Sequence, residues 1–170
     1  TPKILQGIMD KEKKVLKEAR CLLDGREISE MFLVGSGSSL NAAVAVSAFA
    51  KKCLGIRVFP VYPADFFGDI GFIPENAVVL GISQQGTSTA VIRALDAVQK
   101  TMQDKEIRTI SMTGEYRTEI TRHGEANIYI ECGYEDAGAT TKGFSAAVLT
   151  LWLFILSTAE RMKKISRSEA

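Results

Sequence analysis

This sequence of 170 residues has no excess of positive or negative charge and contains few cysteine and histidine residues. Lys and Arg together number 21 against 20 Asp and Glu, so the formal net charge is +1 and no strong field attracts nucleic acid or an anionic membrane. The three cysteines, Cys21, Cys53 and Cys132, form no C-x-x-C pair, and His123 is the single histidine. A disulfide framework and a histidine-rich metal site are therefore disfavoured, and we expect no metal, no nucleic-acid partner and no membrane partner.

Long hydrophobic runs are lacking as well. The most apolar stretch, residues 144–156, contains Ser145 and Thr150 and is followed at once by polar residues, so it is typical of a buried helix and too short for a bilayer span. The first 25 residues are dense in charge where a secretory signal would be apolar. These features predict a cytoplasmic protein, and the absence of methionine before Thr1 is consistent with a piece of a longer chain.

Apolar segments bounded by glycine or polar residues alternate with segments of helical periodicity. The first kind is typical of strands buried on both faces of a parallel sheet, and the second kind predicts helices. The expected strands are 31–34, 57–62, 77–82, 107–112 and 127–130, and the expected helices are 3–23, 39–54, 88–104 and 141–165. This alternation predicts one α/β domain over residues 1–170, with an N-terminal helix within 1–25 and a three-layer α/β/α arrangement. The five-stranded parallel sheet is expected to have the common order 2-1-3-4-5.

Two loops in this pattern are rich in hydroxyl groups. They follow the first and third expected strands, at residues 35–41 and 83–89, and each leads into a helix. The N-terminus of a helix offers free N–H groups and a dipole that favours an anion. In the order 2-1-3-4-5 the first and third strands are neighbours, so the two loops would face each other. Ser and Thr are also the usual helix caps, but two such loops exceed what capping requires and favour a small phosphate group.

A dinucleotide site is the obvious competitor for these loops. Gly35 and Gly37 begin a G-x-G-x-x-G pattern, but Leu40 stands where the third glycine belongs, and no carboxylate ends the second strand. The G-x-x-x-x-G-K-[ST] pattern of nucleotide-binding P-loops is absent too. We therefore expect neither a nicotinamide nor a nucleotide cofactor.

Three segments of the chain resemble the sugar isomerase (SIS) domain family. They are GSGSSLN at 35–41, ISQQGTS at 82–88 and EDAGATTKGF at 135–144, in an order and spacing that cover nearly the whole chain. The chain is similar to the first SIS copy of glucosamine-6-phosphate synthase-like and fructosamine deglycase-like proteins. This resemblance implies a domain that binds a phosphorylated sugar or amino sugar. It also implies the first half of a two-copy phosphosugar isomerase, aminotransferase-like enzyme or fructosamine-phosphate deglycase.

The resemblance also implies which residues bind the substrate. Those expected at the phosphate are Ser38, Ser39, Ser83, Gln84, Gln85 and Ser88, and those expected along the sugar are Gly138, Ala139 and Thr140. The chain departs from the family at Gln85, where a serine is usual, and at Thr87, where a glutamate is usual. An amide still donates hydrogen bonds, so the departure at Gln85 weakens the expected contact without removing it.

Glu135 is the candidate catalytic residue. A carboxylate beside the sugar can move a proton between C1 and C2 through an enediol. The competing interpretation is an acid that favours the dipole of the following helix, and Asp136 is a second candidate. In two-copy relatives the base and the ring-opening histidine usually come from the second copy, to which nothing in this chain corresponds. His123 itself precedes a strand, where a structural role as a helix cap is expected.

Other functions remain open on the sequence alone. SIS domains also serve as non-catalytic sensors of sugar phosphates in transcription regulators, and a stand-alone isomerase could complete its site with neighbouring subunits. The final helix is apolar around its whole circumference, so one of its faces is expected to bury against a second SIS domain or a homodimer partner.

Overall fold

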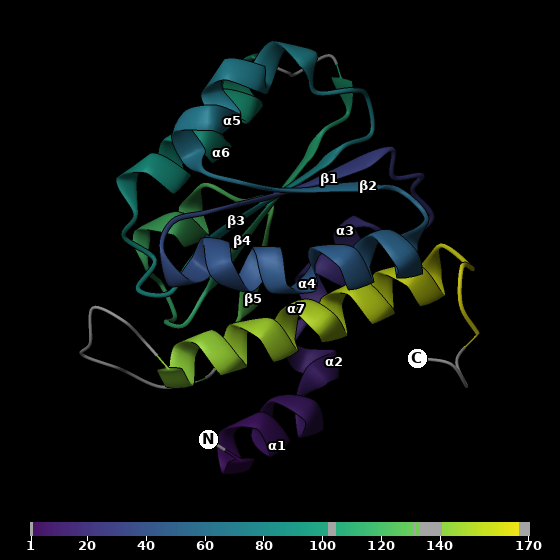
Figure 1. The fold of residues 1–170 in the computed structure, drawn as a ribbon, viewed down its shortest axis with the longest axis vertical. Helices are drawn as coiled ribbons and strands as arrows, with labels where there is room; N and C mark the ends of the chain where they lie inside the picture. Colours follow the sequence, from purple (N-terminus) through teal and green to yellow (C-terminus); the bar gives the residue numbers. More distant parts are fainter. Residues whose placement is uncertain (1, 102–104, 131, 133–140, 167–170) are drawn as a thin grey trace.

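The computed structural model describes residues 2–101, 105–130, 132 and 141–166, which form three layers (Figure 1). The middle layer is a five-stranded sheet in the order β2-β1-β3-β4-β5. Its strands are β1 (Glu30–Gly35), β2 (Arg57–Val61), β3 (Val78–Ser83), β4 (Arg108–Thr113) and β5 (Ala126–Tyr129). Every neighbouring pair is parallel, so the predicted fold class and strand order are confirmed.

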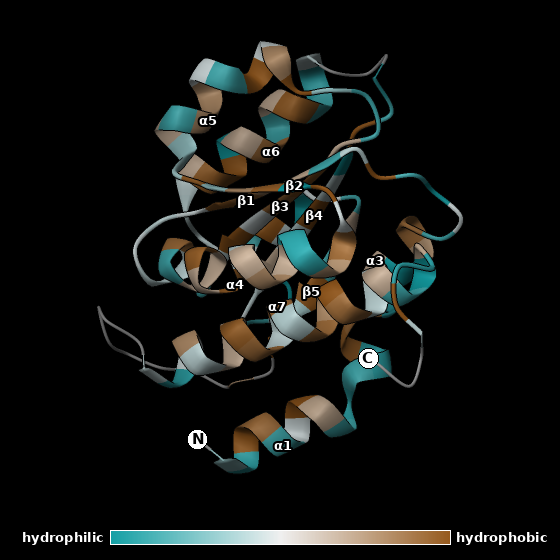
Figure 2. Ribbon diagram, turned by 45° about the vertical axis from the view of Figure 1, so that its right-hand side comes forward, coloured by the Kyte–Doolittle hydropathy of each residue, from teal (hydrophilic) through white to brown (hydrophobic). Residues whose placement is uncertain are grey.

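Helices cover both faces of this sheet. One side carries α4 (Ser38–Leu54) and α7 (Thr141–Arg161), which pack against each other. The other side carries α5 (Pro63–Asp69), the short 3₁₀ helix η1 (Ile70–Phe72) and α6 (Thr89–Thr101), while a second 3₁₀ helix, η3 (Glu119–Arg122), precedes β5. All six residues of β1 and all six of β3 are buried, because these strands lie inside the sheet and are covered on both faces. Figure 2 shows hydrophobic colour along β1 and along much of α7.

The N-terminal segment differs from the single helix that the sequence predicts over 3–23. It is divided into α1 (Pro2–Asp10), α2 (Glu12–Val15) and α3 (Lys17–Leu22). The breaks lie at Lys11 and Leu16, whose φ and ψ angles of −107° and 8°, and −96° and 1°, are not those of an α-helix. The prediction of one continuous helix was wrong because α1 packs against α7 whereas α3 packs against β5. One straight helix could not contact both elements.

The chain covers more of α7 than the sequence analysis anticipates. α4 packs on one side of α7 and α1 on another, which buries Ile8 of α1 almost completely. Trp152 of α7 stays 45% exposed and lies 5.6 Å, between ring centroids, from Phe49 of α4. Within the described ranges, α7 is long and apolar enough to cross a membrane by length and composition alone, but 56% of its most apolar window is buried inside the protein. A buried core helix passes the same test, so this is weak evidence for a membrane span.

Candidate functional site

The loop after β1 turns sharply into α4. Gly37 is the N-cap residue of α4, with φ of 55° and ψ of −127°, and among the described residues no side chain caps this helix by a hydrogen bond. Ser38 and Ser39 are therefore the first two residues of α4, and Ser39 is partly buried. A Cβ atom on Gly35 would lie 3.1 Å from the backbone nitrogen of Leu40, so glycine lets the loop approach the end of the strand closely. This brings the start of α4 directly to the carboxyl end of β1.

The loop after β3 is held by its own hydrogen bonds. Ser83 ends β3 and is 6% exposed, and its Oγ accepts a hydrogen bond from the backbone N–H of Ser88 at 3.3 Å. The backbone oxygen of Ser88 accepts a hydrogen bond from the N–H of Ile92 at 3.0 Å, which places Ser88 directly before α6. Gly86 has a φ of 67°, and its N–H donates to the backbone oxygen of Ser83 at 3.0 Å. Gln85 is exposed at the tip of the loop.

The two loops leave adjacent strands at the same edge of the sheet. Gly35 of β1 is paired with Ile82 of β3, so the strands end side by side. The chain then turns toward opposite faces, into α4 from β1 and into α6 from β3. A parallel sheet has its ligand crevice at such a point, where connections to the two faces diverge. The prediction that these loops leave neighbouring strands is confirmed, and the start of each helix favours an anion there.

The side chain of Gln84 forms a hydrogen bond with another side chain of the protein. Its Nε2 donates a hydrogen bond to the Sγ of Cys132 at 2.8 Å. Its backbone oxygen accepts one from the N–H of Gly114 at 2.9 Å. Gln84 therefore joins the end of β3 to the ends of β4 and β5. Sequence reasoning missed this role, because Cys132 lies 48 positions away in the sequence.

Both loops lie within a segment of the chain that matches a known protein family. The family model of the SIS domain matches residues 26–157 of the chain. The chain belongs to the SIS domain family. This match runs from the residues just before β1 through most of α7 and so includes both loops.

Individual relatives match over nearly the whole of this SIS domain. A glutamine–fructose-6-phosphate aminotransferase (isomerizing) from Fusobacterium nucleatum is 28% identical over 170 residues, which are 98% of this chain and 27% of that protein. The solved structure of a candidate phosphosugar isomerase from Clostridium difficile 630 superposes with a TM-score of 0.87 at 27% identity, over 99% of this chain and 46% of that one. The C-terminal domain of a glucosamine-fructose-6-phosphate aminotransferase from Francisella tularensis shares the fold with a TM-score of 0.77 at 17% identity, over 89% of this chain and 41% of that one. The SIS domain therefore spans about a quarter of the first relative and just under half of the second.

Part of the expected substrate site of the SIS domain lies outside the described residues. These are Glu135, Gly138, Ala139 and Thr140, together with the alternative acid Asp136. The described structure resumes at Thr141, where α7 begins. The roles expected for these residues, and for the serines of the two loops, stay predictions.

His123 caps η3 in this SIS domain, which confirms its predicted structural position. Its Nδ1 lies 2.5 Å from Oδ1 of Asp96, and its Nε2 lies 3.3 Å from Oε1 of Glu119. The hydrogen bond with Asp96 is the main reason that the pKa of His123 is raised above 6.5, with Glu119 acting in the same direction against the effect of burial. His123 precedes β5, so it lies toward the amino edge of the sheet, opposite to the two loops.

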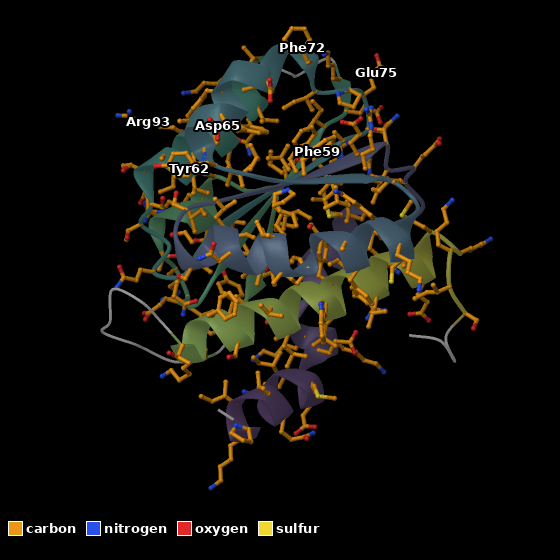
Figure 3. All side chains as sticks on the ribbon, viewed as in Figure 1. Phe59, Tyr62, Asp65, Phe72, Glu75 and Arg93 are labelled. Atoms are coloured by element: carbon orange, nitrogen blue, oxygen red, sulfur yellow. The ribbon has the colours of Figure 1, made fainter. Side chains whose placement is uncertain are left out.

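A separate hollow of about 300 Å³ lies along β2. Its walls include Phe59 and Phe72, which Figure 3 labels on the side of the sheet that carries α5. Phe72 is 85% exposed, and the guanidinium of Arg57 lies over the ring of Phe59 and pairs with the buried carboxylate of Glu30. None of the serines of the two loops lines this hollow, so it is no part of the site described above. Within the described part of the chain, no group of three or more His, Cys, Asp or Glu residues is arranged to hold a metal ion.

Proposed function

We propose that this SIS domain binds a phosphorylated sugar or amino sugar with its phosphate in the crevice between the loop after β1 and the loop after β3. The observation that carries the proposal is the departure of α4 and α6 toward opposite faces from two adjacent strands. Both helices begin at the ends of these strands, where the helix dipole favours an anion. The N–H of Ser39 donates to the backbone oxygen of Ser36 at 3.1 Å, so the hydroxyls of Ser38, Ser39 and Ser88 are the groups proposed to bind the phosphate oxygens. Ser83 is buried and accepts a hydrogen bond from Ser88, so its part is to hold the loop in shape.

The reaction that fits such a ligand is an isomerisation of the phosphosugar. A base removes the proton from the carbon beside the carbonyl group while the carbonyl oxygen gains a proton, which gives the enediol. The base then returns its proton to the former carbonyl carbon while the other hydroxyl of the enediol loses its proton, and this converts aldose to ketose without an oxidant or a metal. Glu135 is the proposed base, and Gly138, Ala139 and Thr140 are proposed to line the sugar. The same kind of proton transfer, beside a carbon–nitrogen double bond in place of the carbonyl group, serves an aminotransferase-like or deglycating enzyme. The name of the Fusobacterium nucleatum relative supports this class of substrate.

The complete enzyme is proposed to need a second SIS unit, either a further domain of a longer chain or a second copy of this one. Support comes from the coverage, because this chain spans 46% of the Clostridium difficile protein. The partly exposed Trp152 on α7 is a further support. We propose a cytoplasmic location for the assembled protein, where sugar phosphates are made and used.

The first experiment compares sugars with and without phosphate. Fructose 6-phosphate and glucosamine 6-phosphate are expected to raise the melting temperature of the protein, and fructose and glucosamine are not. Equal responses to the phosphorylated and unphosphorylated sugars would contradict the assignment of the two loops.

The second experiment removes one hydroxyl at the crevice. Ser39→Ala is expected to weaken binding of fructose 6-phosphate about 10- to 150-fold in calorimetry, because a hydrogen bond to a charged group contributes about 1.5–3 kcal/mol. Ser47→Ala is the matched control, since Ser47 lies on the same helix and bonds to the backbone oxygen of Val44. A control variant that loses as much affinity as Ser39→Ala would show that α4 as a whole, and not the hydroxyl, was disturbed.

A further inference from the structure

Two glycines enclose the side-chain amide of Gln84. A Cβ atom on Gly114, just after β4, would lie 2.8 Å from the backbone oxygen of Gln84 and 3.0 Å from its Cδ. A Cβ atom on Gly143, in the first turn of α7, would lie 2.9 Å from Cδ and 3.1 Å from both Nε2 and Oε1. Both glycines are buried, so the slot that they form has room for Gln84 only because neither carries a side chain.

Backbone conformation does not explain these glycines. Neither Gly114 nor Gly143 has a positive φ, the region in which glycine is favoured over other residues. A glycine inside a helix such as α7 costs about 0.5–1 kcal/mol relative to alanine. Space for Gln84 is the property that both positions share.

The slot links three parts of the candidate site. Gln84 begins the loop after β3, Cys132 follows β5, and Gly143 lies in the first turn of α7. In the sequence, Cys132 and Gly143 bracket Glu135, Gly138, Ala139 and Thr140, the residues proposed to act on the sugar. A side chain that contacts both ends of this segment fixes them relative to the phosphate loop.

We infer that Gln84 is a positioning residue for sugar recognition and not a ligand of the phosphate. Its amide is engaged by Cys132 and enclosed by Gly114 and Gly143, so it sets the place of Cys132 and of the start of α7 relative to the loop that binds the phosphate. This inference rests on the proposed function. It assigns the phosphate of the ligand to the loop after β3, and the sugar to the stretch of sequence bracketed by Cys132 and Gly143. The phosphate then binds through α4 and α6, and Gln84 determines how well the sugar is discriminated.

The slot itself is tested by suppression, without any ligand. Gly143→Ala alone is expected to lower the urea midpoint of unfolding, because the new methyl group meets Gln84. In a Gln84→Ala background the same change is expected to be neutral or to raise the midpoint, because the clash is gone and alanine favours the helix. Gly68→Ala on α5 is the control, since no atom of the described residues lies within 4 Å of its Cβ position. It should have the same effect in both backgrounds, and equal losses from Gly143→Ala in both backgrounds would overturn the inference.

The positioning role is tested by comparing inorganic phosphate with fructose 6-phosphate. The affinity of Gln84→Ala for inorganic phosphate is expected to stay within about twofold of that of the unaltered protein. The ratio by which the protein binds fructose 6-phosphate more tightly than inorganic phosphate is expected to fall at least tenfold. Gln84→Met fills the slot without the hydrogen bond and should recover part of that affinity. A parallel loss for both ligands would make Gln84 a phosphate ligand and overturn the inference.

The outcomes of the two tests separate this inference from the proposed function. If the unaltered protein binds neither ligand while the suppression is observed, the proposed function is rejected and so is the positioning role of Gln84. The packing of Gln84 between the two glycines is still supported in that case. If the unaltered protein binds fructose 6-phosphate but suppression is absent, the proposed function stands and the role of Gln84 is rejected.

Discussion

Gly86 occupies a backbone conformation that other residues adopt only with strain. Its φ is 67°, and a Cβ atom there would overlap the side chain of Thr118 and lie 2.9 Å from Oγ1 of Thr113. Gly86→Ala is expected to destabilise the protein by at least about 2 kcal/mol, since the left-handed conformation alone costs about 1–2 kcal/mol and overpacking adds to it. Binding of fructose 6-phosphate should fall with it, because Gly86 lies within the loop after β3.

Urea unfolding and calorimetry measure both effects of Gly86→Ala. Gly7→Ala on α1 is the control, because its φ is not positive and no atom in the described part of the chain lies within 4 Å of its Cβ position. Wild-type stability in Gly86→Ala would show that the loop has an alternative conformation without the positive φ.

His123 gives the stability of the protein a defined pH dependence. Its pKa is raised above 6.5, chiefly by the hydrogen bond with Asp96, so the folded state favours the protonated imidazole. The stabilisation is therefore fully present below pH 6.5 and is lost as the pH rises through the higher pKa of the folded state. His123→Gln is expected to reduce stability at about pH 5.5 and to change it much less at about pH 8.5.

Urea unfolding of both proteins at the two pH values checks the role of His123. His123 is the single histidine of the chain, so no other imidazole contributes to the difference. A larger loss on the alkaline side would mean that the neutral imidazole is the stabilising form.

At the scale of single residues, the sequence predicts where hydroxyl groups stand relative to the strands and helices. It does not predict which side chains contact one another. Ser39 and Ser88 could be placed at the carboxyl ends of two neighbouring strands because each stands at the junction of a strand and a helix in a fold whose strand order is common. The contact of Gln84 with Cys132 could not be predicted, because it depends on how the ends of three strands meet. Gly114 and Gly143, which enclose the side-chain amide of Gln84, are not marked by any local sequence pattern either.

At the scale of elements, the strands were predictable because β1 and β3 are buried on both faces and their sequences are continuously apolar. α5 was missed, because its seven residues are too few to show a helical period. The division of the N-terminal helix was missed for another reason. Its apolar residues do follow a helical spacing, and only the separate positions of α7 and β5 require breaks at Lys11 and Leu16.

α3 protects one edge of the sheet through a single carboxylate. β5 is an edge strand, and Oε2 of Glu18 accepts hydrogen bonds from the backbone N–H of Asn127 at 2.9 Å and from its Nδ2 at 3.2 Å. An unpaired N–H on an edge strand is a site for pairing with another chain. Glu18→Ala is therefore expected to reduce stability by about 1–3 kcal/mol and to increase aggregation on heating.

Chemical unfolding and light scattering during heating test the role of Glu18. Glu12→Ala on α2 removes the ion pair with Arg20, 3.5 Å between the charged atoms, and serves as the control. That partly exposed pair contributes about 0–1 kcal/mol. Equal effects of the two substitutions would indicate that the bond to the edge strand has no special weight.

At the scale of the whole molecule, the helical layer that contains α7 leaves large apolar side chains exposed. Val44 of α4 is 53% exposed, Met9 of α1 is 53% exposed and Trp152 of α7 is 45% exposed. α1 covers part of the face of α7 that the sequence analysis assigned to a second unit, but it leaves Trp152 uncovered. Tryptophan is among the residues that contribute most when an interface buries them.

The chain is accordingly expected to associate through the face of α7 that carries Trp152. Light scattering at tens of micromolar should show a dimer or a larger species, and Trp152→Glu should shift it toward the monomer because a charge in an apolar interface is costly. Phe72→Glu is the control, since Phe72 is 85% exposed on the other side of the sheet and lies in η1. A shift to monomer in the Phe72 variant and not in the Trp152 variant would move the interface to the hollow along β2. A monodisperse monomer of the unaltered protein at this concentration would contradict the prediction that the chain associates.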